Sequence, residues 1–215
     1  FANADAVISF SDWSAKLAGA DFSVIRTEST SQPDLVVLTR RAPEREASAS
    51  GRQSGIATVF FTSGTTGDAK GVVQTVSSTL ANAEGTKRSG LITADDVLTS
   101  CLPLYHVNAF NFSFVLPLYL GCRIVYHSGL VPNFWSILEA EHASIASLSP
   151  PILRLLLKDS RSQTATRTLR YVISASSALH RSDLHSFRDR FGVRVNQAYG
   201  LSETINFTLF TPPNL

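Results

Sequence analysis

The sequence predicts an α/β fold with a mainly parallel sheet flanked by helices, and two observations carry that prediction. Short apolar runs, several of them rich in β-branched residues, occur at 56–61, 97–102, 122–126, 171–173 and 193–198, as is typical of buried strands. Helix-compatible segments lie between these runs. Strands that alternate with helices favour a parallel sheet whose crossover connections are helical.

Apolar spacing and prolines place the helical segments. Residues 74–89 and 180–191 have helix-compatible patterns, and 108–120 is apolar enough for a buried helix. Pro132 and Pro151 stand at the start of two further apolar segments, where first-turn prolines belong. These segments form the predicted helical layers.

The chain is expected to form a single α/β unit over residues 1–215, with its motif-bearing core at 56–210. Its length fits one domain or one large piece of a bigger one. Leu35–Leu38 predicts a short strand. Residues 40–55 have almost no apolar content, and we expect them to form a mobile connector.

Composition excludes several classes of protein. Hydrophobic residues make up 44% and charged residues 17% of the chain, which excludes an intrinsically disordered protein. The two cysteines, Cys101 and Cys122, exclude a disulfide scaffold and a cysteine metal cluster. The chain shows no apolar run of about 18 residues and no signal-peptide pattern, so we expect a cytoplasmic protein without a membrane span.

Residues 62–71, TSGTTGDAKG, are the stretch with the clearest chemical pattern. Its glycines are Gly64, Gly67 and Gly71, and its hydroxyl donors are Thr62, Ser63, Thr65 and Thr66. Glycines let the backbone approach a ligand closely, and Lys70 adds a positive charge. We expect the stretch between a strand and a helix start, where free backbone N–H groups suit a polyphosphate.

The spacing excludes two common nucleotide loops. The P-loop of NTPases needs a Lys directly after Gly and before Ser or Thr, whereas Lys70 follows Ala69 and precedes Gly71. The dinucleotide fingerprint Gly-x-Gly-x-x-Gly is also missing from this stretch. A polar surface turn is the plain alternative, but ten such residues exceed what a turn needs.

The stretch resembles the phosphate-binding signature of the adenylate-forming superfamily, which includes acyl-CoA synthetases, nonribosomal peptide adenylation domains and firefly luciferase. Residues 102–108, LPLYHVN, resemble the PLxHxN stretch of acyl-CoA synthetases, and residues 196–204, NQAYGLSET, resemble the YGxTE motif. The three motifs follow the family's order. The resemblance covers about residues 56–210 and implies a partial N-terminal domain of the acyl-CoA synthetase-like fold.

The resemblance implies that a carboxylate attacks the α-phosphate of ATP, with Mg²⁺, to give an acyl-adenylate and pyrophosphate. Transfer to a thiol such as coenzyme A follows. Because both reactants are anions, catalysis depends on positioning and charge neutralisation. By the same resemblance, the β- and γ-phosphates are bound by Lys70 and by six loop residues, namely Thr62, Ser63, Gly64, Thr65, Thr66 and Gly67.

The YGxTE-like segment supplies the remaining nucleotide contacts by the same resemblance. Tyr199 stacks on adenine, between Ala198 and Gly200, and Gly200 lets the ring approach. Ser202 stands where the family usually has Thr and contacts the α-phosphate. Glu203 binds Mg²⁺, a cation that prefers oxygen ligands. A solvated loop acid is the plain alternative for Glu203.

Residues 174–178, SASSA, occupy the place of the family's SGAAP-like turn, which borders the adenine and acyl pockets. Ser174, Ala175 and Ser176 are therefore nucleotide contacts by resemblance, and Ser176 is also an acid contact. The glycine and proline of the family's turn are missing here. That change leaves the shape of the pocket open.

The segment after the PLxHxN stretch bears on the acid substrate. Amino-acid-activating relatives carry an Asp where this chain has Asn108. An amide does not neutralise an ammonium group, which favours an acyl or aryl acid. The resemblance places His106 near the carboxylate, although a buried hydrogen-bonded histidine is the plain alternative. Phe110, Phe112 and Phe114 are expected to pack in the core rather than line an acyl tunnel.

Other polar clusters are discounted. His180 and His185 lack a zinc-binding spacing and are expected on a solvent-facing helix surface. Nine basic residues in 154–194 are diluted by three acids and lack interleaved aromatics, which argues against nucleic acid. A solvated face is expected there, with contact to coenzyme A phosphates as the alternative.

Three hypotheses about the function of the chain stay open. The first is an acyl-CoA synthetase-like ligase, and the second is an adenylation domain that loads a carrier-protein phosphopantetheine. The third is a non-catalytic nucleotide-binding remnant. The chain begins with Phe1, holds no Met and stops soon after Thr204. We therefore expect a partial domain without the family's C-terminal lid and its catalytic lysine, not fully active alone.

Overall fold

The structure is a computed structural model, and it describes residues 6–10, 22–27, 35–40, 55–62, 69–127, 133–159 and 167–212. From the sequence we expect one unit over residues 1–215, whereas the contacts divide the chain into Phe1–Gln53 and Ser54–Leu215. The boundary falls within the predicted connector 40–55, of which residues 41–54 lie outside the described residues.

The first unit contains a three-stranded antiparallel sheet in the order β1-β3-β2. Its strands are β1 (Ala6–Phe10), β2 (Phe22–Thr27) and β3 (Leu35–Arg40). The predicted strand Leu35–Leu38 is confirmed as part of β3, the central strand.

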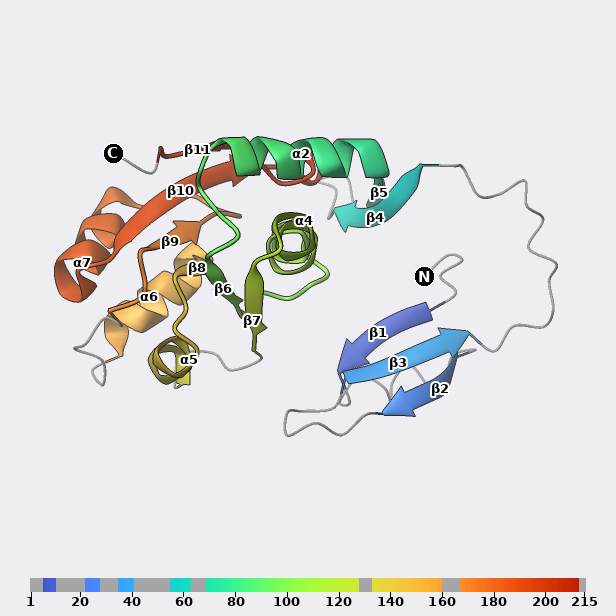
Figure 1. Cartoon of the computed structure of the whole chain (residues 1–215), viewed down its shortest axis with the longest axis horizontal. Helices are drawn as coiled ribbons and strands as arrows, with labels where there is room; N and C mark the ends of the chain where they lie inside the picture. Colours follow the sequence, from blue (N-terminus) through green and yellow to red (C-terminus); the bar gives the residue numbers. More distant parts are fainter. Residues whose placement is uncertain are drawn as a thin grey trace. The chain divides into compact units, whose positions relative to one another are not determined.

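The second unit is built on a six-stranded sheet in the order β11-β10-β9-β8-β6-β7 (Figure 1). Five strands are parallel: β6 (Val97–Ser100), β7 (Arg123–Tyr126), β8 (Ile145–Leu148), β9 (Tyr171–Ser174) and β10 (Arg194–Gly200). The edge strand β11 (Phe207–Phe210) runs antiparallel to β10. The predicted mainly parallel sheet is confirmed.

Helices cover both faces of this sheet (Figure 1). They are α2 (Val76–Arg88), α3 (Val107–Phe110), the π-helical turn η2 (Asn111–Val115), α4 (Leu116–Leu120), α5 (Phe134–Ala140), α6 (Pro150–Lys158) and α7 (Arg181–Phe191). Ile173 packs with Phe112 and Leu116 in one apolar core. Its neighbour Val172 points to the other face, into a second core with Leu153. This alternation follows from the two-residue period of a strand.

The predicted helix over 108–120 is present, but η2 interrupts it, and part of it is exposed. Phe112 is buried, whereas Phe114 and Leu118 are 52% and 72% exposed. Pro151 lies in the first turn of α6, as predicted. Pro132 lies outside the described residues.

Within the described parts of the chain, no helix is long and apolar enough to cross a membrane.

The expected position of the 62–71 stretch, between a strand and a helix, is wrong. Residues 63–68 lie outside the described residues, and the segments that flank them pair as the antiparallel strands β4 (Ile56–Thr62) and β5 (Lys70–Thr75) of a hairpin. The β-branched Val72 and Val73 pair with Phe60 and Val59, so β5 is a strand. Helix α2 begins only afterwards, where Thr75 accepts a hydrogen bond from the backbone N–H of Ser78 at 3.1 Å.

The order of the parallel strands places a switch point beside β6. The chain moves from β6 to β7 on one side, and then returns to β8 on the other side of β6. In open α/β sheets, ligands bind outside the carboxyl ends of the strands at such a point. The edge formed by the ends of β6, β8, β9 and β10 is therefore where a site is expected.

A buried carboxylate closes the opposite edge, at the amino ends of the strands. Asp96, directly before β6, is 3% exposed. It accepts hydrogen bonds from the Thr93 backbone N–H at 2.9 Å, from the Ser144 hydroxyl at 2.7 Å and from the Arg170 guanidinium at 2.9 Å. Ser144 precedes β8 and Arg170 precedes β9. Asp96 thus links the starts of three neighbouring strands.

Replacing Asp96 by alanine is expected to lower the free energy of unfolding by about 2–4 kcal/mol, because it leaves buried donors without an acceptor. Chemical denaturation measures the change. The matched control is Asp95→Ala, because Asp95 is the exposed neighbour, and a surface substitution changes stability by about 0.5 kcal/mol or less. Equal effects of the two substitutions would contradict a structural role for Asp96.

Candidate functional site

A cavity of about 460 Å³ lies at the carboxyl edge of the sheet. Four of its lining residues lie one or two positions after the end of a parallel strand: Leu102 after β6, Ser149 after β8, Ser176 after β9 and Leu201 after β10. The cavity therefore occupies the edge that the strand order singles out.

Predicted site residues gather in this first cavity. Its lining includes His106, Asn108, Ala175, Ser176, Gly200 and Ser202. Apolar groups complete it, among them Phe60 and Phe61 of β4. The Phe60 ring meets Phe110 edge-on, with ring centroids 5.6 Å apart. His106 is exposed and lies directly before α3, so it is not the buried core histidine of the plain alternative.

A second cavity, of about 680 Å³, also borders the 174–178 turn. Its lining includes the predicted residues Ser174, Ser176, Ala198, Tyr199 and Gly200. Tyr199 is 57% exposed, so its ring is available to a ligand. The Ser174 hydroxyl is buried without a hydrogen-bond partner among the described residues.

The two cavities share a wall made of Ser176, Gly200 and Leu201. A ligand in one cavity therefore lies next to a ligand in the other. This adjacency suits a reaction that joins two bound molecules.

Glycine is required at position 200 by the backbone. A Cβ added there would lie 1.7 Å from the carbonyl oxygen of Asn206. Because β11 folds back against β10 with a register shift between Tyr199 and Gly200, the chain passes too close for any side chain. Gly200 therefore shapes the shared wall through its backbone contact.

Ser176 has a left-handed backbone, with φ of 75°, a conformation that L-residues adopt at some cost. Its hydroxyl accepts a hydrogen bond from the Asn108 amide nitrogen at 3.3 Å. Asn108 is buried, and it also lines the first cavity. The amide from α3 thus holds the strained 174–178 turn.

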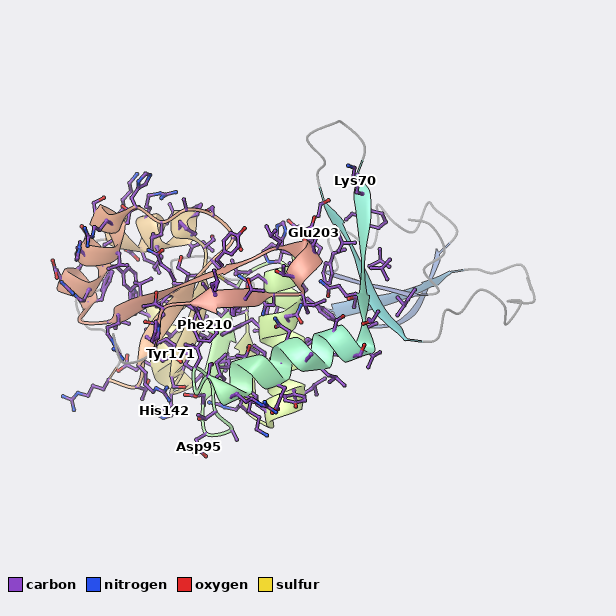
Figure 2. The ribbon with its side chains drawn as sticks, turned by 90° about the horizontal axis from the view of Figure 1, so that it is seen from above. Lys70, Asp95, His142, Tyr171, Glu203 and Phe210 are labelled. Atoms are coloured by element: carbon purple, nitrogen blue, oxygen red, sulfur yellow. The ribbon has the colours of Figure 1, made fainter. Side chains whose placement is uncertain are left out.

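Lys70 and Glu203 lie outside both cavity linings. Lys70 is exposed at the start of β5, opposite Thr62, whose hydroxyl is 3.4 Å from the Lys70 carbonyl oxygen. Glu203 is exposed on the 3₁₀ turn η4 (Ser202–Thr204). Figure 2 shows both side chains at the hairpin end of the unit, whereas Asp95 and His142 lie at the opposite end. The predicted loop residues Ser63–Gly67 lie outside the described residues.

Glu203 fits one mode of Mg²⁺ binding. Magnesium is often held by one or two carboxylates together with substrate phosphates and waters, and an exposed carboxylate suits an ion that arrives with a polyphosphate. Over the described ranges, no three His, Cys, Asp or Glu side chains form a metal-binding group. His180 and His185 are both exposed, as expected.

Burial raises the pKa of two groups close to Leu102, a residue that lines the first cavity. The Tyr126 hydroxyl donates to the carbonyl oxygen of Leu102 at 2.9 Å, and burial raises its pKa. Burial also raises the pKa of the Cys101 thiol. A raised pKa disfavours the thiolate form, so the surroundings of Cys101 do not activate its thiol as a nucleophile.

Two arginines of the basic segment 154–194, for which a nucleic-acid role was not expected, link helices α6 and α7 through side-chain contacts. Arg154 of α6 pairs with Asp183 of α7 at 3.1 Å. Arg190 of α7 donates to the carbonyl oxygens of Leu157 and Asp159 at the end of α6. At least part of this charge therefore serves helix packing.

Several residues of the site were not predicted from the sequence. Phe60, Ser149 and Asn206 line the first cavity, and Gln74 bonds the Ser202 carbonyl oxygen at 2.9 Å. Ser149 had a usable signal, because it directly follows a buried strand. Gln74 had none, because its bonds to Ser202 and Ile205 join segments distant in the sequence.

Comparison with known proteins places the chain in a family. The family model described as AMP-binding enzyme matches residues 5–215. The chain belongs to this family, within the adenylate-forming, acyl-CoA synthetase-like superfamily.

Two curated relatives illustrate the similarity. The chain is 32% identical over 149 residues to a sulfoacetate–CoA ligase of Cupriavidus necator, covering 69% of the chain and 29% of the relative. It is 29% identical over 150 residues to a 2-succinylbenzoate–CoA ligase of Enterococcus faecalis, covering 69% and 30%. The matched region thus spans about 30% of the length of these relatives.

Solved structures support the same fold. ATP-bound MatB from Rhodopseudomonas palustris has a TM-score of 0.68 and 26% identity, covering 74% of this chain and 32% of that one. The O-succinylbenzoate coenzyme A synthetase MenE from Bacillus subtilis, in complex with AMP, has a TM-score of 0.67 and 25% identity, with coverage of 74% and 32%.

Gly200→Ala is expected to destabilise the β10–β11 hairpin by at least about 3 kcal/mol, because its Cβ would overlap the Asn206 carbonyl group. Thermal and chemical unfolding measure the change. Gly85→Ala is the matched control, because a Cβ there meets nothing within 4 Å, and alanine in a helix stabilises by about 0.5–1 kcal/mol. A Gly200→Ala protein with unchanged stability would show that the two strands do not approach so closely.

Proposed function

We propose that the protein that carries this chain activates a carboxylic acid with ATP, as an acyl-adenylate, and then transfers the acyl group to the thiol of coenzyme A. One observation carries the proposal: two cavities at the carboxyl edge of the sheet share Ser176, Gly200 and Leu201. The relatives that are named as CoA ligases, and the neighbours bound to ATP or AMP, support it.

The second cavity is the proposed nucleotide site, and the first is the proposed acid site. Adenine stacks on the exposed ring of Tyr199, while Gly200 keeps the wall thin between the two ligands. The α-phosphate then lies near Ser202, which borders the first cavity. Attack of the carboxylate oxygen on the α-phosphorus forms the new P–O bond, and pyrophosphate leaves with the electrons of the broken P–O bond.

The hairpin and the η4 turn supply positive charge and a metal ligand in this proposal. Lys70 neutralises charge on the β- and γ-phosphates, together with the 62–67 loop. When bound, Mg²⁺ reduces the repulsion between the phosphates and the carboxylate, and Glu203 is its protein ligand. Reducing that repulsion is the main task, because both reactants are anionic.

The lining of the acid site favours an acyl or aryl acid. Asn108 contributes a neutral amide, and Phe60, Leu102 and Ile152 contribute apolar surface. No carboxylate lines this cavity among the described residues, so nothing there pairs with the ammonium of an amino acid. The names of the relatives favour coenzyme A over a carrier-protein phosphopantetheine as the thiol acceptor.

Carboxylate-dependent ATP–pyrophosphate exchange tests the proposal directly, with a panel of fatty, aryl and amino acids. Exchange with a fatty or aryl acid is the expected result, and a coenzyme A against carrier-protein comparison then identifies the thiol. Exchange with amino acids alone would overturn the assigned acid class. No exchange with any acid, in a protein that still binds ATP, would favour a non-catalytic nucleotide-binding protein.

Lys70→Ala is expected to weaken binding of Mg-ATP about tenfold, ~1.4 kcal/mol, and to change AMP binding much less. AMP lacks the two phosphates that Lys70 is proposed to hold. Isothermal titration calorimetry measures both affinities. Lys158→Ala, at the exposed end of α6, is the control and should change neither. Equal weakening of ATP and AMP would remove Lys70 from the β/γ-phosphate site.

Glu203→Gln keeps the length of the side chain but removes its charge, so we expect about a tenfold rise in the Mg²⁺ concentration needed for half-maximal exchange. Magnesium titrations at fixed ATP measure this concentration. Glu139→Gln, an exposed change on α5, serves as the control. If the Mg²⁺ requirement does not move, Glu203 is not a metal ligand.

A further inference from the structure

The turn that carries Ser202 and Glu203 ends in a strained residue. Ile205 has φ of 73° and ψ of −54°, and the Asn206 backbone N–H donates to the Thr204 carbonyl oxygen at 2.9 Å. This is a γ-turn of the rarer, strained hand. A β-branched residue in that region is an outlier that persists only when surrounding contacts hold it.

Two buried amides hold the turn by its carbonyl groups. The Asn111 amide nitrogen donates to the Ile205 carbonyl oxygen at 3.0 Å. The Gln74 amide nitrogen donates to the Ser202 carbonyl oxygen at 2.9 Å and lies 3.5 Å from the Ile205 carbonyl oxygen. Gln74 is 1% and Asn111 is 2% exposed, so both amide donors are shielded from solvent.

The other end of the Gln74 side chain is tied to the hairpin. Its amide oxygen accepts a hydrogen bond from the Thr58 hydroxyl of β4 at 3.1 Å. Gln74 itself belongs to β5, the strand that begins at Lys70. One side chain therefore joins both strands of the hairpin to both ends of the Ser202–Ile205 turn.

The same helical segment holds a second strained turn. Asn108, three positions before Asn111, donates to the Ser176 hydroxyl at 3.3 Å, and Ser176 also has a positive φ. Both strained turns thus border the first cavity, and each is held by an asparagine amide. The pattern argues that these amides maintain the geometry of the site.

We propose that Gln74, supported by Asn111, is a positioning residue that fixes Ser202 and Glu203 relative to the hairpin that carries Lys70. The inference rests on the proposed function, because it concerns the same nucleotide site. Without the amide, the carbonyl oxygens of Ser202 and Ile205 lose buried donors. The strained turn then relaxes, and Lys70 and Glu203 no longer face one triphosphate with a set spacing.

Gln74→Met removes the hydrogen bonds and keeps the length of the side chain. We expect amide hydrogen exchange at Thr204–Asn206 to accelerate about tenfold, and Mg-ATP affinity to fall about tenfold, with AMP affinity changed by less than about threefold. Thr58→Val removes the hydroxyl that orients Gln74, and it should move both readouts in the same direction by about threefold. If Gln74→Met does not fold, the milder Thr58→Val variant tests by itself whether Gln74 positions the turn.

Asn82→Leu is the matched control. The Asn82 amide nitrogen donates to the Phe207 carbonyl oxygen at 3.0 Å, a similar bond to the strand directly after the turn. We expect it to lower thermal stability without selective change in exchange at Thr204–Asn206 or in Mg-ATP affinity. If Gln74→Met and Thr58→Val change exchange and Mg-ATP affinity no more than Asn82→Leu does, the hydrogen bonds of Gln74 serve stability alone and the inference is wrong.

The same measurements separate failure of this inference from failure of the proposed function. A parent protein that binds neither Mg-ATP nor AMP overturns the proposed function, and with it a role for Gln74 in nucleotide binding. A parent protein that binds both, with variants that leave the preference for Mg-ATP over AMP unchanged, overturns the inference alone.

Discussion

Helices cover both faces of the parallel sheet, and this two-sided burial decides where the polar side chains of the second unit lie. Every residue of β8 and β9 is buried, so groups that need a ligand or solvent are displaced to the strand ends. At the amino ends, Asp96 closes the edge with hydrogen bonds to three neighbouring segments. At the carboxyl ends, the edge opens into two adjoining cavities. The buried Asp96 network and the two cavities thus lie on opposite edges of the sheet.

Backbone geometry shapes the open edge as much as side-chain chemistry does. The carbonyl group of Asn206 occupies the space where a side chain at Gly200 would lie, and Ser176 and Ile205 both have positive φ. Buried amides from Asn108, Asn111 and Gln74 hold these turns. Strained turns persist where surrounding contacts over-determine them, and here they border the wall between the cavities.

Local patterns predicted most strands and helices of the second unit, and the hairpin shows where such patterns fail. Residues 70–75 form a strand because Val72 and Val73 pair with Phe60 and Val59. A six-residue segment beside a glycine-rich stretch does not reveal that pairing, since short apolar runs fit several structures. The prediction that a helix begins directly after residues 62–71 was therefore wrong. The strand before this stretch and the helix that follows β5 were both predicted.

The sequence by itself determined the fold class, the order of the motifs and those cavity residues that lie within the motifs at or just after the end of a strand, such as Gly200 and Ser176. These features are local, because the end of each strand and the residues after it lie within one short segment. Tertiary structure alone decided the shared wall and the roles of Gln74 and Asn111. Their bonds to the Ser202–Ile205 turn join positions 128 and 94 residues apart. At such separations only the packing of the folded chain determines which amide meets which carbonyl group.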